Sequence, residues 1–289
     1  MLKPRIGGEW WNIASDPDLG ELTNPKQQPV DFAVWRAADG TWQLWSCIRG
    51  TNAEGNSRLF YRWEGQNLRD PNWCPMGIAM EADPSCGETP GGLQAPYVLS
   101  HKGTYLMFYG DWENICLATS VDGKSFQRRL LPSGKCGMFS EGTGWNTRDP
   151  MTIRIGSTWY CYYTAFPQNQ GAVYCRTSED LINWSDSKMV AFGGSAGTGP
   201  YSSECPFVVQ HESGFYYLFR TQRYGEDAQT SIYISDDPLY FGIEDDSRLV
   251  CRLSIAAPEI VRHDDRYFIA CLLPDLKGIR MAELDWVSI

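Results

Sequence analysis

Carboxylates stand at the start of several apolar, strand-like segments of this chain, and their type suits acid–base chemistry. Asp149 directly precedes a proline, Glu204 stands two residues before one, and Asp31 opens an apolar run near the N-terminus. Carboxylates held in one pocket repel one another, which raises the pKa of at least one of them. The protonated group can then act as a general acid and the ionised one as a general base or nucleophile. These three residues are therefore candidate catalytic residues, provided that the fold brings them together.

A repeat of just over 50 residues carries these carboxylates. Its prolines, Pro96, Pro150, Pro206 and Pro258, recur at intervals of 54, 56 and 52 residues. Each proline begins an apolar strand, and aromatic-rich second strands follow at residues 105–109, 159–163, 215–219 and 267–271. Ser-x-Asp turns that end on an aromatic residue come next, at residues 120–126, 178–184 and 235–241. An earlier unit with a longer insert, residues 50–57, begins at Asp31, so the repeat occurs five times.

Five units of four strands predict an all-β protein, a five-bladed β-propeller with four-stranded antiparallel blades. The last unit ends after its third strand, and we expect residues 10–13 to complete that sheet and close the ring. The whole chain, residues 1–289, is expected to be one catalytic domain. No segment has a helical period, so very little helix is expected.

The first strands of propeller blades begin at one face, around the axis, so residues at their starts share a pocket. The repeat places Asp31, Gln94, Asp149, Glu204 and Glu259 at those starts. We expect Glu259 to be a strand-start or surface carboxylate rather than a catalytic one. The other three acids suit glycoside hydrolysis, in which one carboxyl protonates the leaving oxygen and another activates water or attacks the sugar.

The motifs Arg148-Asp149-Pro150 and Glu204-Cys205-Pro206, with an aspartate opening the first blade, resemble those of a five-bladed glycosidase superfamily, glycoside hydrolase families 43, 62, 32, 68 and 117. The resemblance covers residues 28–286. It implies that Asp31 is the general base or nucleophile, that Asp149 orients the sugar and modulates the acid, and that Glu204 is the general acid.

The chain departs from the family patterns at the first blade. Asp31 is followed by a phenylalanine rather than a proline, and the Trp-Met-Asn-Asp-Pro-Asn-Gly motif of family 32 is missing there, although that family carries the Glu-Cys pair. Membership of one family therefore stays open. A second Arg-Asp-Pro copy, at residues 69–71, aligns with the outer Ser-x-Asp turn, and we expect it in a surface loop.

Segments that follow the second strands should line the rim of the pocket. The expected substrate-binding residues are Arg49, Gln94, Trp112, Trp145, Arg148, Arg220 and Arg223. A tryptophan can stack on a sugar face, whereas core packing is the alternative for Trp112 and Trp145. The arginines can bind hydroxyls or a carboxylate, and for Arg220 and Arg223 a plain salt bridge is the alternative.

The sequence thus predicts a glycosidase that removes a terminal sugar, with arabinofuranosyl, xylosyl and fructosyl groups as candidates. A non-catalytic carbohydrate-binding propeller and a glycoside phosphorylase of family 130 type are the alternatives. The choice between inverting and retaining chemistry depends on the distance between the carboxyls, which the sequence leaves open.

Charge and cysteine usage limit the partners and cofactors. The net charge of −10 without a basic patch disfavours nucleic acid, and no apolar run is long enough to span a membrane. The expected partner is an oligosaccharide, and the oligomeric state is left open. The protein is expected in the cytoplasm, or in the periplasm or outside the cell if a signal peptide has been removed.

No metal or other cofactor is expected. His101, His211 and His263 each fall five residues after a blade proline, at the turn away from the pocket, so a histidine metal site or a serine triad loses support. The ten cysteines include no C-x-x-C pair, and most of them lie in apolar runs. We expect most of them to be free thiols in the core.

Overall fold

Runs of aromatic and β-branched residues separated by short polar turns favour strands throughout the chain. A computed structural model describes all residues from Met1 to Ile289, and it contains 21 β-strands. Helical structure is limited to five 3₁₀ turns: η1 (Gly20–Leu22), η2 (Pro84–Cys86), η3 (Pro167–Asn169), η4 (Gly194–Ala196) and η5 (Gly225–Asp227). The expectation of very little helix is therefore confirmed, and none of these turns is long enough to cross a membrane.

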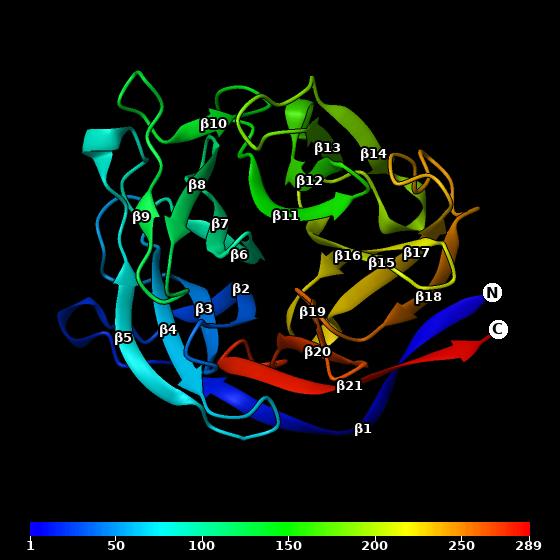
Figure 1. The fold of residues 1–289 in the computed structure, drawn as a ribbon, viewed down its shortest axis with the longest axis horizontal. Coiled ribbons are helices and arrows are strands. Elements are labelled where there is room, and N and C mark those ends of the chain that lie inside the picture. Colours follow the sequence, from blue (N-terminus) through cyan, green and yellow to red (C-terminus); the bar gives the residue numbers. More distant parts are fainter. The chain divides into compact units, whose positions relative to one another are not determined.

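The strands form five antiparallel sheets, which are the blades of a five-bladed β-propeller (Figure 1). Blade 1 consists of β2 (Gln28–Arg36), β3 (Trp42–Arg49), β4 (Leu59–Gly65) and β5 (Cys74–Met80). Blade 2 consists of β6 (Gln94–His101), β7 (Thr104–Gly110), β8 (Ile115–Ser120), β9 (Gln127–Arg128) and β10 (Gly137–Phe139). Blade 3 consists of β11 (Arg148–Ile155), β12 (Thr158–Ala165), β13 (Ala172–Ser178) and β14 (Lys188–Phe192).

Blade 4 consists of β15 (Glu204–Gln210), β16 (Tyr216–Arg223), β17 (Gln229–Ser235) and β18 (Leu249–Leu253). Blade 5 consists of β19 (Glu259–His263), β20 (Arg266–Leu272), β21 (Gly278–Ser288) and β1 (Leu2–Ser15), in which the first strand of the chain pairs with the last (Figure 1). The predicted fold is confirmed, including completion of the last sheet by the N-terminal segment.

Close contacts divide the chain into two compact units. Unit 2 comprises Asn12–Pro150 and Leu276–Ile279 and holds blades 1 and 2. Unit 1 comprises Met1–Trp11, Met151–Asp275 and Arg280–Ile289 and holds most of blades 3, 4 and 5. Each unit has an aromatic core: the rings of Trp45 and Phe126 lie 5.3 Å apart in unit 2, and those of Tyr217 and Trp286 lie 4.5 Å apart in unit 1.

Blade 2 departs from the four-strand plan because its outermost strand is interrupted. The two residues of β9 pair with Ala118 and Thr119, whereas β10 pairs with Ile115 and Cys116 of the same strand, β8. Residues 129–136 leave the sheet between these two short strands (Figure 1). The outer edge of this blade therefore has fewer ladder hydrogen bonds than a continuous strand would provide.

All five blades share a backbone feature at the start of the first strand. One residue there has a positive φ: Asp31 (38°), Ala95 (42°), Asp149 (56°), Cys205 (46°) and Ala257 (50°). In blades 1, 2 and 4 the strand pairing also shifts by one residue at this point, as in a β-bulge. Bulges re-aim side chains, and left-handed non-glycine residues cost about 1–3 kcal/mol each. The repeat therefore preserves a strained conformation where the sequence places the candidate acids.

Candidate active site

The candidate acids occupy two different positions of this bulge. Asp31 and Asp149 are themselves the left-handed residues, whereas Glu204 precedes the left-handed Cys205, as Gln94 precedes Ala95. Aspartate tolerates the left-handed region better than most residues. Glu259 comes two residues after the left-handed position in blade 5, as the first residue of β19, so it stands apart from the other acids.

Burial separates the three acids into two groups. Asp149 is 4% exposed, and its Oδ2 lies 3.8 Å from Nε of the buried Arg148. Asp31 and Glu204 are both half-buried. A group that exchanges a proton with a substrate must be reachable, whereas a group that orients other residues can be enclosed. This difference suits Asp31 and Glu204 to proton transfer and Asp149 to positioning.

In unit 2, cationic side chains lie beside the start of blade 1. Burial raises the pKa of the Cys47 thiol to about 12, Arg58 and Arg49 oppose this rise, and the charge of Asp31 adds to it. All three charged groups therefore lie near Cys47, which pairs with Val30 next to Asp31. Arg49 donates through Nε and Nη2 to Oε1 of Gln28, at 3.0 and 2.8 Å.

Arg58 also lies near the start of blade 1, and the sequence analysis did not single it out. Its guanidinium lies 5.1 Å from the ring centroid of the half-buried Trp112, a cation–π arrangement. It follows the 50–57 insert, and a parallel bridge to Gly92 fixes its backbone. No sequence motif identifies an arginine at the end of an insert, so its position beside Trp112 is known only from the folded structure.

The predicted residues of blades 2 and 3 in unit 2 lie close together. A Cβ atom at Gly110 would lie 3.3 Å from Cα of Arg148 and 3.4 Å from Cβ of Gln94, so these residues pack against a glycine. Gln94 is 1% exposed, and its buried Oε1 accepts no hydrogen bond. Trp145 is half-buried in a turn whose Gly144 N–H donates to Glu113, the residue after Trp112.

In unit 1, hydrogen bonds from blade 3 fix the backbone next to Glu204. Oγ1 of Thr164 donates to the carbonyl of Ser203 at 2.5 Å, and Oγ of Ser203 donates to the carbonyl of Gly171 at 2.9 Å. The neighbouring Cys205 has its Sγ 3.2 Å from Oη of Tyr224. Two anchored neighbours hold Glu204 in a defined position, as a catalytic carboxyl requires.

The two arginines predicted on blade 4 have separate roles. Arg220 is 1% exposed and donates to the carbonyls of Ser202, Gly193 and Gly197, at 3.1, 3.3 and 3.3 Å. Its guanidinium therefore holds the 193–203 loop. Arg223 is exposed and donates to Oε1 of Gln229 at 2.6 Å. Neither arginine forms the salt bridge considered from the sequence.

The histidines and cysteines lie where the sequence placed them. His101 and His263 end the first strands of blades 2 and 5, and His211 follows that of blade 4. All ten cysteines are free thiols, and seven of them are buried. Cys205 and Cys251, expected in apolar runs, are half-buried.

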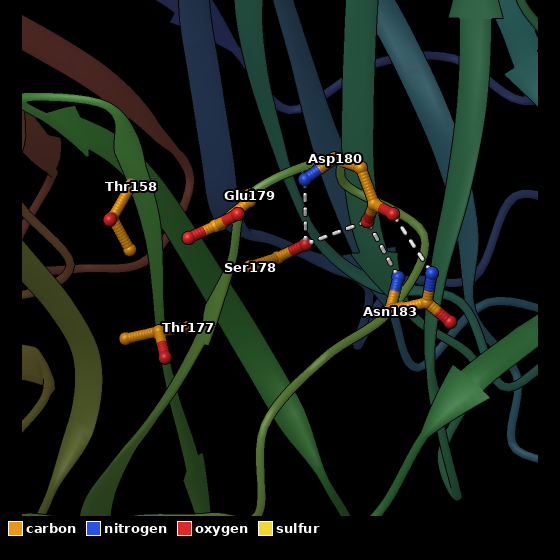
Figure 2. A pocket seen from close by; sticks show the side chains of 6 residues that line it. All are labelled: Thr158, Thr177, Ser178, Glu179, Asp180 and Asn183. Atoms are coloured by element: carbon orange, nitrogen blue, oxygen red, sulfur yellow. Dashed lines mark hydrogen bonds between the residues drawn. The ribbon is translucent and has the colours of Figure 1, made fainter.

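A pocket of about 460 Å³ lies elsewhere, at the Ser-x-Asp turn of blade 3 (Figure 2). Thr158, at the start of β12, borders it, so it lies at the opposite end of the β11–β12 hairpin from Arg148. The Asp180 carboxylate that lines it accepts hydrogen bonds from the backbone and side chain of Asn183, both at 2.8 Å, and from Ser178. These bonds lower the pKa of Asp180, and the one from the backbone N–H of Asn183 contributes most. The pocket is thus lined by a structural turn rather than by the candidate acids.

Three solved structures show what this fold is similar to. A thermostable family-43 glycoside hydrolase has 20% identity and a TM-score of 0.67, with 93% of each chain covered. An exo-1,5-α-L-arabinanase from a bovine ruminal metagenomic library has 15% identity and a TM-score of 0.63, covering 89% of this chain and 92% of that one. A family 32 β-fructofuranosidase of Bombyx mori has 17% identity and a TM-score of 0.65, covering 94% of this chain and 62% of that one.

Sequence comparisons add no closer relative. No family model matches the chain, and no curated protein does. At these identities the structural likeness concerns the architecture: the chain has the five-bladed β-propeller fold that glycoside hydrolases of families 43 and 32 also have.

Proposed function

We propose that this protein is a glycoside hydrolase that removes a terminal arabinofuranosyl, xylosyl or fructosyl group from an oligosaccharide. One observation carries the proposal: acids at the strained starts of blades 1, 3 and 4 differ in burial as the reaction requires. The fold shared with the family-43 hydrolase and the fructofuranosidase supports the same reaction class. The likeness to an exo-arabinanase supports exo action and an arabinofuranosyl substrate.

The three acids take different roles in this mechanism. Glu204, in its protonated form, donates a proton to the glycosidic oxygen as the bond to the leaving group breaks. Asp31, ionised, either removes a proton from the attacking water or attacks the anomeric carbon itself. Asp149 is a positioning residue, which Arg148 holds beside the reacting sugar.

Aromatic and cationic side chains of unit 2 suit sugar binding. Trp112 is a half-buried ring that contacts the Arg58 guanidinium and can stack on a sugar with its other face, and Trp145 lies on a loop tied to the neighbouring turn. The half-buried Arg49 supplies donors for sugar hydroxyls, whereas the enclosed Gln94, at 1% exposure, is assigned to supporting the neighbouring residues. On blade 4 we assign Arg220 to holding the 193–203 loop and Arg223 to the exposed rim.

The test is sugar release from a panel of arabino-, xylo-, fructo-, galacto- and algal oligosaccharides, with the wild type and Glu204→Gln compared side by side. Glu204→Gln should lower kcat by about 10²–10⁴-fold, the usual contribution of general acid–base catalysis, with unchanged folding by circular dichroism. Preserved activity would remove Glu204 from the mechanism. NMR of the first-formed anomer then distinguishes inversion from retention.

Two outcomes would replace hydrolysis by another function. Binding of a panel sugar with an equal affinity in both proteins, and no release by either, would indicate a carbohydrate-binding propeller. Turnover that requires inorganic phosphate and yields a sugar phosphate would indicate a phosphorylase.

A further inference from the structure

Three buried cysteines from distant parts of the sequence meet at the outer edge of blade 2. Cys86 ends η2, Cys116 lies on β8 and Cys136 directly precedes β10. The Sγ atom of Cys136 lies 3.6 Å from that of Cys86 and 3.8 Å from that of Cys116. All three side chains are at most 5% exposed. Because the three residues are 20 to 50 positions apart, no sequence motif marks them.

Two buried carboxylates border these thiols. The ligand atoms of Cys86, Glu88 and Cys136 all lie within 4.8 Å of one another, and so do those of Asp111, Cys116 and Cys136. Glu88 and Asp111 are 2% and 1% exposed. Burying a carboxylate without a compensating charge is costly, so the balance of charge around each one matters.

The two carboxylates are compensated differently. Glu88 forms two hydrogen bonds of 2.8 Å with the Arg128 guanidinium and accepts a third from Tyr109. Asp111 accepts hydrogen bonds from the backbone of Glu113 and from Asn114 but has no cationic partner. The Asp111 carboxylate, beside the thiols, is therefore a buried negative charge that no cation of the protein balances.

We propose that this cluster binds one thiophilic divalent cation, Zn²⁺ in the first instance, through the thiolates of Cys116 and Cys136 and the carboxylate of Asp111, with water as the fourth ligand. Zinc is usually bound tetrahedrally by four such ligands, at about 2.3 Å from sulfur, which places the sulfurs about 3.8 Å apart. The observed separation of 3.8 Å between the sulfurs of Cys116 and Cys136 matches this spacing. Binding releases two thiol protons to solvent. Glu88, already paired with Arg128, and Cys86 stay outside the ligand set.

The position of the cluster explains what the cation would do. The excursion of residues 129–136 interrupts the fourth strand of blade 2, and its end is held to η2 by one backbone bond, from the Cys136 N–H to the Cys86 carbonyl at 3.1 Å. A cation bound to Cys136, Cys116 and Asp111 would fasten the end of the excursion to β8, as structural zinc does in small domains. Pro84 and Ser85 are exposed, so η2 gives the ion a short route inward.

The experiment uses the full-length, reduced protein after treatment with a chelator. Titration with Co²⁺ should produce the charge-transfer and d–d absorption of tetrahedral thiolate coordination, saturating at one ion per chain, and Zn²⁺ should displace it. Saturating Zn²⁺ should raise Tm by about 5–10 °C. Absence of this absorption, together with no retained zinc by mass spectrometry, would overturn the proposal. A Cys86–Cys136 disulfide in the unreduced protein that re-forms in preference to metal binding would do so too.

Variants identify the ligands. Cys136→Ser should abolish the cobalt absorption, and Asp111→Asn should weaken binding at least tenfold. Glu88→Gln should retain the absorption, and Cys161→Ser, which removes a buried thiol on β12, serves as the matched control and should bind as the wild type does. Loss of binding in Cys161→Ser would contradict the assignment. If Cys136→Ser does not fold, the wild-type titration still decides, and it does not depend on any glycosidase activity.

Discussion

The tripeptide Arg-Asp-Pro occurs twice in this protein, and its two copies have different environments. At residues 148–150 it begins β11, where Asp149 is 4% exposed and has a φ of 56°. At residues 69–71 it lies between β4 and β5, where Asp70 accepts hydrogen bonds from the backbone and side chain of Asn67, at 3.0 and 2.9 Å. The second copy thus lies in a turn, as its place in the repeat predicted.

The comparison shows that the place in the blade, rather than the tripeptide, decides the environment of the aspartate. A first strand is covered by its neighbours, so its aspartate is buried and needs the adjacent Arg148 to offset the loss of water. An outer turn is open to solvent, so Asp70 stays hydrated and its arginine neighbour is exposed. If the tripeptide mattered by itself, the same substitution would have similar effects in both copies.

The largest expected difference is in catalysis. Asp149→Asn should lower kcat by about 10²-fold or more, because the variant keeps the shape but loses the charge that positions the reacting groups. Asp70→Asn should change kcat less than twofold. Steady-state kinetics on the substrate found in the panel measures both values, with near-ultraviolet circular dichroism as the folding control. Equal losses in the two variants would refute the assignment of Asp149 to the site.

The arginines should differ in stability. Arg148→Ala leaves a buried carboxylate without its cation and should lower the free energy of unfolding by about 3–5 kcal/mol. Arg69→Ala, at an exposed position, should change it by less than about 0.5 kcal/mol. Urea denaturation measures both, and Arg148→Lys should recover part of the loss because it restores the charge without the planar guanidinium. An equally small effect of Arg148→Ala would mean that the buried pair contributes nothing net.

The fold and the identity of the candidate acids could be read from the sequence because both depend on periodic features. Aromatic second strands recur in all five blades, the proline in four and the Ser-x-Asp turn in three, and each reflects a local backbone requirement. The left-handed residues of the bulge were not predicted, because alanine and cysteine adopt that conformation only when neighbouring strands enforce it. The spacing to the blade proline does show that Gln94 and Glu204 stand one position earlier than Asp149, since Ala95 and Cys205 separate them from their prolines.

Contacts between segments distant in sequence were beyond the sequence analysis. Arg58 meets Trp112 across more than 50 residues, and the thiols of Cys86, Cys116 and Cys136 belong to three segments without a shared motif. Arg220 holds its loop through backbone carbonyl groups, which every residue has. No residue type in the loop could therefore predict this role from the sequence.

A half-buried carboxylate without an arginine extends the comparison. The Glu259 side chain forms no hydrogen bond or ion pair, and burial raises the pKa of its carboxyl well above the ordinary value. Above the pKa of the unfolded chain, folded Glu259 holds a proton that the unfolded chain releases, so stability falls with rising pH until the folded-state pKa is passed. This contribution is at most about 1.4 kcal/mol per pH unit. The stability difference between the wild type and Glu259→Gln, measured by urea denaturation from pH 4.5 upward, should follow that slope, and a constant difference would contradict it.

The smallest expected effect lies in the exposed copy and concerns stability alone. Asp70→Ala removes the acceptor of two hydrogen bonds from Asn67 and should lower the free energy of unfolding by about 1 kcal/mol, because the freed donors can bind water instead. Asn67→Ala removes only the side-chain donor and should cost less. Thermal denaturation of the two variants, with kcat measured in parallel, checks both statements. If kcat falls by more than the loss of stability explains, the turn at residues 69–71 affects the active site. The two copies of the tripeptide would then not be functionally distinct.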